Sequence, residues 1–197
     1  MKREDILFYI MIIFIVGIII KLYFDSEAYQ LSCISSNVDG KTYCVRERAK
    51  IQLVADLIAT VANKMQKLVD HMHKTYPDRE NIQRLKKRFN IEKIGEILPT
   101  SKHTAYSENK GEKIRFCVTE EKDNNRLIDE NTLTFVAIHE LSHISSKSIG
   151  HNNEFWDNFT FLLKHAVDIG MYKPVDYKKQ PRRYCGMKIS DNPYYNK

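Results

Sequence analysis

The segment that most constrains the fold of this 197-residue chain is 135–143, which reads FVAIHELSH. As a helix, it places His139 and His143 four residues apart, one turn above the other on the same face. Two imidazoles with this spacing can bind one zinc ion, and Glu140 beside them can take a proton from a metal-bound water. The pattern therefore predicts a zinc-hydrolase site, against the alternative of an amphipathic helix with two incidental histidines.

A hydrolytic zinc site takes three protein ligands and leaves one position open, so the chain has to supply a third ligand. His151 directly follows Gly150, where the chain can turn back toward the helix, and we expect it to be that ligand. Glu154 is the main alternative, because carboxylates also serve as third ligands of zinc. Glu140 is expected to act as the general base and not to bind the metal. Candidates for an additional donor to the oxyanion are Tyr172, Tyr177 and Tyr184, which the sequence does not discriminate.

An apolar run occupies residues 6–24, with Lys21 as its only charge. Such a run spans roughly 28 Å as a helix, close to the ~30 Å hydrocarbon core of a bilayer. It is longer than the apolar part of a usual signal peptide. We therefore expect an uncleaved single-pass membrane anchor. The alternative is a cleaved signal peptide, because Ser26-Glu27-Ala28 offers the small residues that a signal peptidase needs at its cleavage site. The flanking lysines and arginines do not decide which side of the membrane the chain faces.

The rest of the chain divides into a linker, one domain and a tail. Residues 1–5 precede the anchor, 25–44 are polar and indicate a linker or loop, 45–171 form the domain, and 172–197 are expected to be mostly irregular. A long helix laid against its own domain is predicted from about 45 to 76, because apolar residues three and four apart recur between 51 and 72; a coiled-coil seam is the alternative. A shorter basic helix is predicted at 79–89.

Two strands and two further helices complete the predicted domain. The strands lie within 103–107 and 113–119 around a glycine-bearing turn, and the alternation in 113–119 predicts one buried and one exposed face. A loop is predicted at 120–126. The motif helix should begin near 129–131 and end at Gly150, with Leu133, Ala137, Leu141 and Ile144 inward. Asn152 or Asn153 should cap the next helix, from which Trp156 is expected to pack on the motif helix.

The composition and the cysteines add weaker constraints. With 43% apolar and 28% charged residues the chain is typical of a folded protein, and its net charge of +6 fits attraction to nucleic acid, attraction to anionic lipid or plain solubility. Cys33 and Cys44 are close enough to predict a small disulfide loop in an oxidising compartment. Cys185 invites comparison with a thiolate that blocks zinc in latent proteases, although a cysteine in a tail has simpler explanations.

The motif His139-Glu-Leu-Ser-His143, the block Gly150-His151-Asn-Asn-Glu-Phe-Trp156 and the apolar helix after them resemble the WLM/SprT-like group of zinc metallopeptidases. This group shows a HExxH helix, a third histidine and an aromatic pair beyond it; here the second and third histidines stand further apart than in the usual family pattern. The resemblance implies Zn²⁺ held by the three histidines, a catalytic Glu140 and an α+β, zincin-like fold, mostly helical with a small β-sheet beside the HExxH helix. The anchored single-domain layout also resembles WLM-domain proteins of large DNA viruses.

These features predict a membrane-anchored zinc metalloendopeptidase that acts on a protein or peptide substrate and enters the lipid bilayer through its N-terminal helix. The strand at 104–107 could hold an extended peptide by edge pairing. A non-catalytic membrane-tethered zinc- or protein-binding module is an alternative, but it would have no need for Glu140. Several members of the group cleave proteins crosslinked to DNA, and the basic stretches 84–88 and 178–183 could contact phosphates. A membrane anchor argues against a role on chromatin, so nucleic acid is not the favoured partner.

Overall fold

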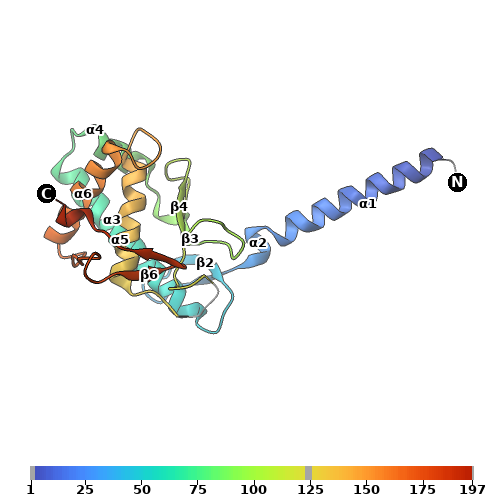
Figure 1. The fold of residues 1–197 in the computed structure, drawn as a ribbon, viewed down its shortest axis with the longest axis horizontal. Coiled ribbons are helices and arrows are strands. Elements are labelled where there is room, and N and C mark those ends of the chain that lie inside the picture. The colour runs from blue at the N-terminus through green and yellow to red at the C-terminus, as the bar shows by residue number, and fades with distance from the viewer. Residues whose placement is uncertain (1–2, 123–125, 197) are drawn as a thin grey trace.

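A computed structural model describes residues 3–122 and 126–196, so the predicted loop at 120–126 lies partly outside the described residues. One long helix, α1 (Arg3–Phe24), projects from a body that contains the other elements (Figure 1). The body combines helices with small sheets, and the predicted α+β class is therefore confirmed.

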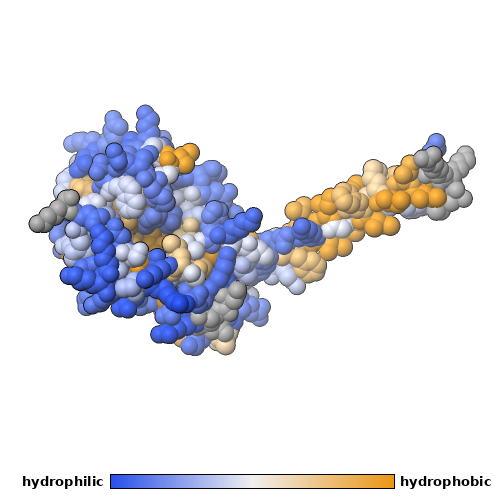
Figure 2. Space-filling model, in the orientation of Figure 1, coloured by the Kyte–Doolittle hydropathy of each residue, from blue (hydrophilic) through white to orange (hydrophobic). Residues whose placement is uncertain are grey.

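The helix α1 is exposed along its described length and carries most of the exposed large apolar side chains of the chain (Figure 2). Within Glu4–Phe24, the most apolar stretch of 18 residues has a mean hydropathy of 2.7, and the helix is long enough to cross a bilayer. No face of this helix is buried against the body. These properties suit a membrane anchor and a signal sequence equally well.

The helix α3 (Ile51–Thr75) supports the body through its apolar stripe, which is packed against α5, α6 and β2. The prediction of a helix laid against its own domain is thus confirmed, but the helix begins at Ile51 and not near Val45, which belongs to a strand. The shorter α4 (Glu80–Arg88) follows, buries Ile82 and Leu85, and contacts both α3 and α5. Buried members of the α3 stripe include Val54, Ile58, Val61, Met65, Leu68 and Met72.

The central sheet has the strand order β3-β5-β4, formed by β3 (Ile94–Glu96), β5 (Lys113–Phe116) and β4 (Ala105–Glu108). The predicted antiparallel pair β4–β5 is present, and the short parallel strand β3, which follows η1 (Ile91–Lys93), was not predicted. The expectation that one face of 113–119 is exposed is wrong for Arg115, Cys117 and Thr119, which are buried. Glu27 of the N-terminal segment covers Arg115, and the C-terminal hairpin covers the other two.

The segment expected to be a linker is structured. It contains α2 (Glu27–Gln30), β1 (Leu31–Ser35) and β2 (Thr42–Arg46), and the two strands form an antiparallel hairpin. Cys33 lies opposite Cys44 in this hairpin and forms a disulfide with it, as predicted. The polar turn between the strands, which includes Gly40 at a φ of +70°, made the segment resemble a loop.

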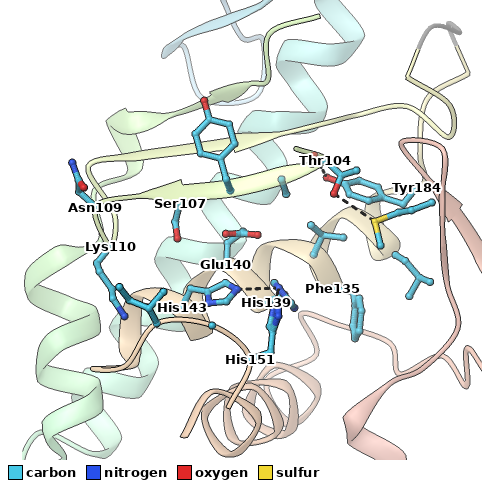
Figure 3. A pocket seen from close by; sticks show the side chains of 17 residues that line it. Thr104, Ser107, Asn109, Lys110, Phe135, His139, Glu140, His143, His151 and Tyr184 are labelled. Carbon is cyan, nitrogen blue, oxygen red and sulfur yellow. Dashed lines mark hydrogen bonds between the residues drawn. The ribbon is translucent and has the colours of Figure 1, made fainter. Parts of the chain in front are cut away.

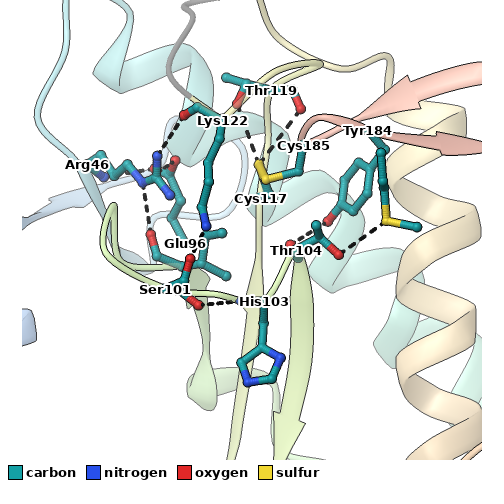
Figure 4. The surroundings of a disulfide bond; sticks show 12 residues. Arg46, Glu96, Ser101, His103, Thr104, Cys117, Thr119, Lys122, Tyr184 and Cys185 are labelled. Atoms are coloured by element: carbon teal, nitrogen blue, oxygen red, sulfur yellow. Dashed lines mark hydrogen bonds and ion pairs between the residues drawn. A yellow bond between two sulfur atoms is a disulfide. The ribbon is translucent and has the colours of Figure 1, made fainter.

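The C-terminal segment is also more ordered than predicted. The strands β6 (Arg182–Tyr184) and β7 (Met187–Ile189) form a tight hairpin, and η2 (Pro193–Tyr195) packs on α6. Cys185 in the hairpin turn forms a disulfide with Cys117, which pins the hairpin to the end of β5 (Figure 4). The hypothesis that Cys185 is a free thiolate able to block zinc is therefore wrong.

Candidate metal centre

The helix α5 (Glu130–Ser145) carries the motif through the middle of the body, packed against α3, α4 and α6 (Figure 1). It begins as predicted, because the Asp129 carboxylate accepts hydrogen bonds from the Thr132 N–H at 2.9 Å and the Thr132 hydroxyl at 2.7 Å. The predicted inward residues are fully buried. The face of α5 that carries His139 and His143 lines a cleft. These inward residues are Leu133, Ala137, Leu141 and Ile144.

The helix ends at Ser145 and not at Gly150, which corrects the predicted boundary. Ser146 is extended, and both its N–H and its hydroxyl donate to the Ser142 carbonyl. A loop follows, and Gly150, at a φ of +86°, turns the chain so that His151 reaches back toward α5. Asn152 then caps α6 (Asn153–Asp168). This loop absorbs the longer interval between the second and third histidines.

The three predicted metal ligands converge (Figure 3). The Nε2 atoms of His139 and His143 are 3.2 Å apart, and those of His139 and His151 are 3.0 Å apart. Ligand atoms of all three residues lie within 4.8 Å of one another. Two nitrogens bound to one tetrahedral zinc at ~2.05 Å are separated by roughly 3.3 Å, so the arrangement suits a single small cation.

Phe155 packs against all three imidazoles, and burial favours the neutral form of His139 and His143. The ring of Phe155 lies 4.8 Å, 4.4 Å and 4.6 Å from the rings of His139, His143 and His151, respectively. Burial, with the neighbouring histidines, lowers the pKa of His139 to about 3 and that of His143 to about 4. Neutral rings are the form that binds metal. Trp156 is 44% exposed beside His151, so Phe155 and not Trp156 makes the contact that we expected with the motif helix.

Glu140 lies in the same cleft, between α5 and β4, with only 4% of its surface exposed (Figure 3). Ser107 of β4 lines the same cleft and lies opposite this carboxylate (Figure 3). Burial raises the pKa of Glu140 to about 8, and the polar groups of the neighbouring Ser107 oppose this shift. A divalent cation among the histidines would also favour the ionised carboxylate that a general base requires. The position of Ser107 beside Glu140 was not predicted, because a serine in a short strand carries no distinctive sequence signal.

The cleft has a volume of about 830 Å³ and is lined by β4, α5, the loop that carries His151 and the C-terminal hairpin. Residues from Thr104 to Ser107 form one wall, α5 forms the floor, and the hairpin contributes Tyr184, Met187 and Ile189. On the outer surface the body is hollowed beside α5, with apolar residues inside a hydrophilic rim (Figure 2). Tyr184 thus reaches the cleft, although its hydroxyl donates to the Thr104 carbonyl at 3.1 Å.

The structure does not bring the remaining candidates to the histidines. Tyr172 and Tyr177 are buried and do not line the cleft. Glu154 binds the loop before His151 instead of the metal position: its carboxylate accepts from the N–H groups of Lys147 and Ser148 at 2.7 Å and 2.9 Å. Glu154 therefore does not compete with His151 as the third ligand.

Comparison with known proteins agrees with this arrangement. Residues 72–196 match the family model of the WLM domain. An uncharacterized protein of Acanthamoeba polyphaga mimivirus is 28% identical over 173 residues, which cover 83% of this chain and 84% of that protein. An uncharacterized protein of Invertebrate iridescent virus 3 is 36% identical over 83 residues, which cover 42% of this chain and 50% of that protein. An uncharacterized protein of Invertebrate iridescent virus 6 is 33% identical over 73 residues, which cover 36% of this chain and 40% of that protein. No solved structure matches the chain.

The WLM match includes α4, α5, α6, the central sheet and the C-terminal hairpin, and so contains all three histidines and Glu140. It covers more than half of the chain. The chain therefore belongs to the WLM domain family, whose members are predicted metallopeptidases of the zincin type.

Proposed function

We propose that the protein is a membrane-anchored, zinc-dependent endopeptidase. One observation carries this proposal: three imidazole nitrogens converge in a cleft that also contains a buried carboxylate, Glu140. A site that only stores or senses a metal has no use for a carboxylate placed beside three neutral ligands. A hydrolase needs such a group as its base.

The residues present fit zinc as the metal. The donor set of His139, His143 and His151 consists of three neutral nitrogens, which is a common set for catalytic zinc with one position left open. Zinc held there would act as a Lewis acid on the scissile carbonyl and would lower the pKa of a water molecule. The cleft leaves space on the exposed side of the triad for both reactants.

In this mechanism Glu140 moves the proton. Its carboxylate takes a proton from the attacking water and delivers it to the leaving amine. Ser107 faces the carboxylate from β4 (Figure 3) and can donate to it during the reaction, and burial shields the carboxylate from bulk water. A correctly oriented base of this kind contributes typically ~10²–10⁴-fold to the rate.

The wall formed by β4 suits an extended peptide. This strand is at the edge of the sheet, next to β5 on one side, and it lines the cleft through Ala105, Tyr106 and Ser107. An edge strand presents backbone donors and acceptors to which another chain can add by strand pairing. A groove that follows a strand accepts an internal stretch of polypeptide, which favours an endopeptidase.

The N-terminal segment supports an anchor over a cleaved signal. Glu27 forms ion pairs with Arg115 at 3.1 Å and with Lys113 at 3.5 Å. Cleavage after Ala28 would remove Glu27 and leave the mostly buried Arg115 without this partner. The two disulfides suit an oxidising compartment, so we place the body on the side of the membrane that faces one.

The proposal is tested with the full-length protein in lipid nanodiscs. We expect it to cleave an unfolded protein such as reduced casein, to lose this activity with a chelator and to regain it with zinc. His151→Ala should bind zinc more weakly and lose cleavage in parallel. Zinc binding without cleavage of any protein would instead favour a tethered binding module.

A further inference from the structure

A second hollow of about 590 Å³ adjoins the cleft. The two share Asn109 and Lys110, which belong to the turn between β4 and β5. Its other charged residues come from the end of α4, from η1 and from the same turn: Lys87, Arg88, Lys93 and Glu112. We call this the basic hollow, because four cationic side chains and a single carboxylate line it.

The charges of the basic hollow are largely uncompensated. Lys87 and Lys93 are exposed, and no residue in the described ranges forms an ion pair with either side chain. Their neighbour Lys86 differs, since its Nζ lies 2.7 Å from Asp70. The carboxylate of Glu112 is already engaged by the side-chain amide of Asn109 at 2.7 Å. The hollow therefore attracts anions.

The fold fixes the basic hollow relative to the catalytic cleft. Asn109 and Lys110 adopt left-handed backbone conformations, with φ values of 45° and 61°, and Gly111 has a φ of +119°. A Cβ at Gly111 would lie 2.6 Å from the Arg88 carbonyl oxygen, so only glycine lets the turn press against the end of α4. Lys110 also donates to the Ser146 carbonyl at 2.9 Å. The turn thus joins α4, the cleft and the loop that carries His151.

The opposite end of the cleft has a different character. Phe135 and Val136 of α5 and Met187 and Ile189 of the hairpin give it an apolar lining. A peptide that lies along β4 would pass from this apolar end, across the histidines, to the turn at Asn109 and Lys110. Its side chains would then meet apolar surface on one side of the scissile bond and positive charge on the other.

We propose that the basic hollow is a substrate subsite for Asp and Glu side chains, and that preferred substrates combine an apolar side chain on one side of the scissile bond with acidic residues on the other. This inference rests on the proposed peptidase function. An acidic peptide suits the hollow better than a nucleic acid does, because the positive charge is concentrated in one concave site that continues a peptide groove. Phosphate backbones are instead bound along extended basic surfaces.

The test uses the full-length, zinc-loaded protein in nanodiscs of neutral lipid and a peptide library whose cleavage sites are identified by mass spectrometry. We expect acidic residues to be enriched on one side of the cleaved bond. In the double variant Lys87→Glu/Lys93→Glu, kcat/KM for acidic peptides divided by kcat/KM for neutral peptides should fall about tenfold or more. High salt should make this fall smaller, because it screens the charges. The control Lys74→Glu/Lys164→Glu carries the same charge change on exposed residues that line neither hollow and should leave the ratio unchanged.

Failure of the subsite and failure of the peptidase function can be told apart. Cleavage without acidic enrichment, or an equal ratio in the two double variants, would refute the subsite alone. If no peptide is cleaved, the peptidase function fails, and binding of a fluorescent acidic peptide to the Lys87/Lys93 and control variants still decides whether the hollow takes carboxylates. Single-stranded DNA that binds more tightly than this peptide, and loses its affinity in Lys87→Glu/Lys93→Glu, would overturn the proposal in favour of a nucleic-acid site.

Discussion

Replacement of Glu154 by Gln should weaken zinc binding although Glu154 is not a ligand. Its carboxylate accepts from the Lys147 N–H at 2.7 Å, from the Ser148 N–H at 2.9 Å and from the Ser148 hydroxyl at 2.5 Å. Arg84 approaches the same carboxylate at 3.4 Å. These contacts hold the loop between the second and third histidines, and the loop positions His151.

The expected magnitude follows from the number of anchored residues. Gln retains one acceptor oxygen but presents an NH₂ group toward a backbone donor, so the two anchored residues of the loop become mobile in the metal-free protein. Ordering a residue costs about 1 kcal/mol or more, so zinc would lose about 2 kcal/mol of binding free energy. This corresponds to roughly a thirtyfold increase in Kd.

The assay is a zinc titration against a chromophoric chelator, with the metal-free thermal unfolding measured alongside. Asp157→Asn is the matched control, because it removes the same charge from an exposed position on the same helix. We expect zinc affinity to fall in Glu154→Gln and to stay unchanged in the control. Equal zinc Kd values for the two variants would refute the argument that Glu154 positions the third ligand.

Three further predictions concern stability and catalysis. Hydrogen bonds from Lys147 and Ser148 lower the pKa of Glu154 from 4.5 to about 2, so its contribution to metal-free stability is present above pH 4.5 and lost as the pH falls toward 2. Because 34% of the Glu154 side chain is exposed, we expect this contribution to be only roughly 1–2 kcal/mol. It is measured as the difference in the free energy of urea unfolding between wild type and Glu154→Gln, at neutral and at acidic pH. A difference that persists at pH 2 would contradict the assignment. Ser107→Ala should lower kcat/KM roughly tenfold, with zinc content unchanged, because it removes the hydroxyl that faces the Glu140 carboxylate (Figure 3). An equal loss of zinc would show that the residue acts on the metal site instead. Cys117→Ser/Cys185→Ser should reduce the free energy of unfolding by about 4 kcal/mol, because the disulfide closes a loop between residues 68 positions apart, and urea unfolding close to wild type would refute this.

The parts of the fold that could be predicted from the sequence are those whose signal is local. The apolar stripe of α3 repeats over several turns, so its helix type and its inward face follow from periodicity alone. The spacing of His139 and His143 fixes their relative direction on a helix, and Asp129 marks the start of that helix. The position of His151 next to the other two histidines could be predicted as well, because it required only a turn of the chain after a recognisable helix.

The parts that could not be predicted depend on contacts between segments distant in sequence. Arg115 and Cys117 look like exposed positions of a two-faced strand, and only the N-terminal segment and the C-terminal hairpin bury them. The hairpin itself has two short strands and is held by a disulfide whose pairing no local pattern reveals. Ser107 acts on Glu140 only because β4 lies alongside α5.

The most direct test of the central claim compares the wild type with Glu140→Gln, both as full-length protein in nanodiscs, by measuring zinc content and cleavage of reduced casein on the same samples. The account predicts equal zinc content and a loss of cleavage of roughly 10²–10⁴-fold in the variant, because the ligands remain and the base is removed. A Glu140→Gln protein that binds zinc and cleaves at the wild-type rate, or a folded wild type that takes up no zinc, would contradict it.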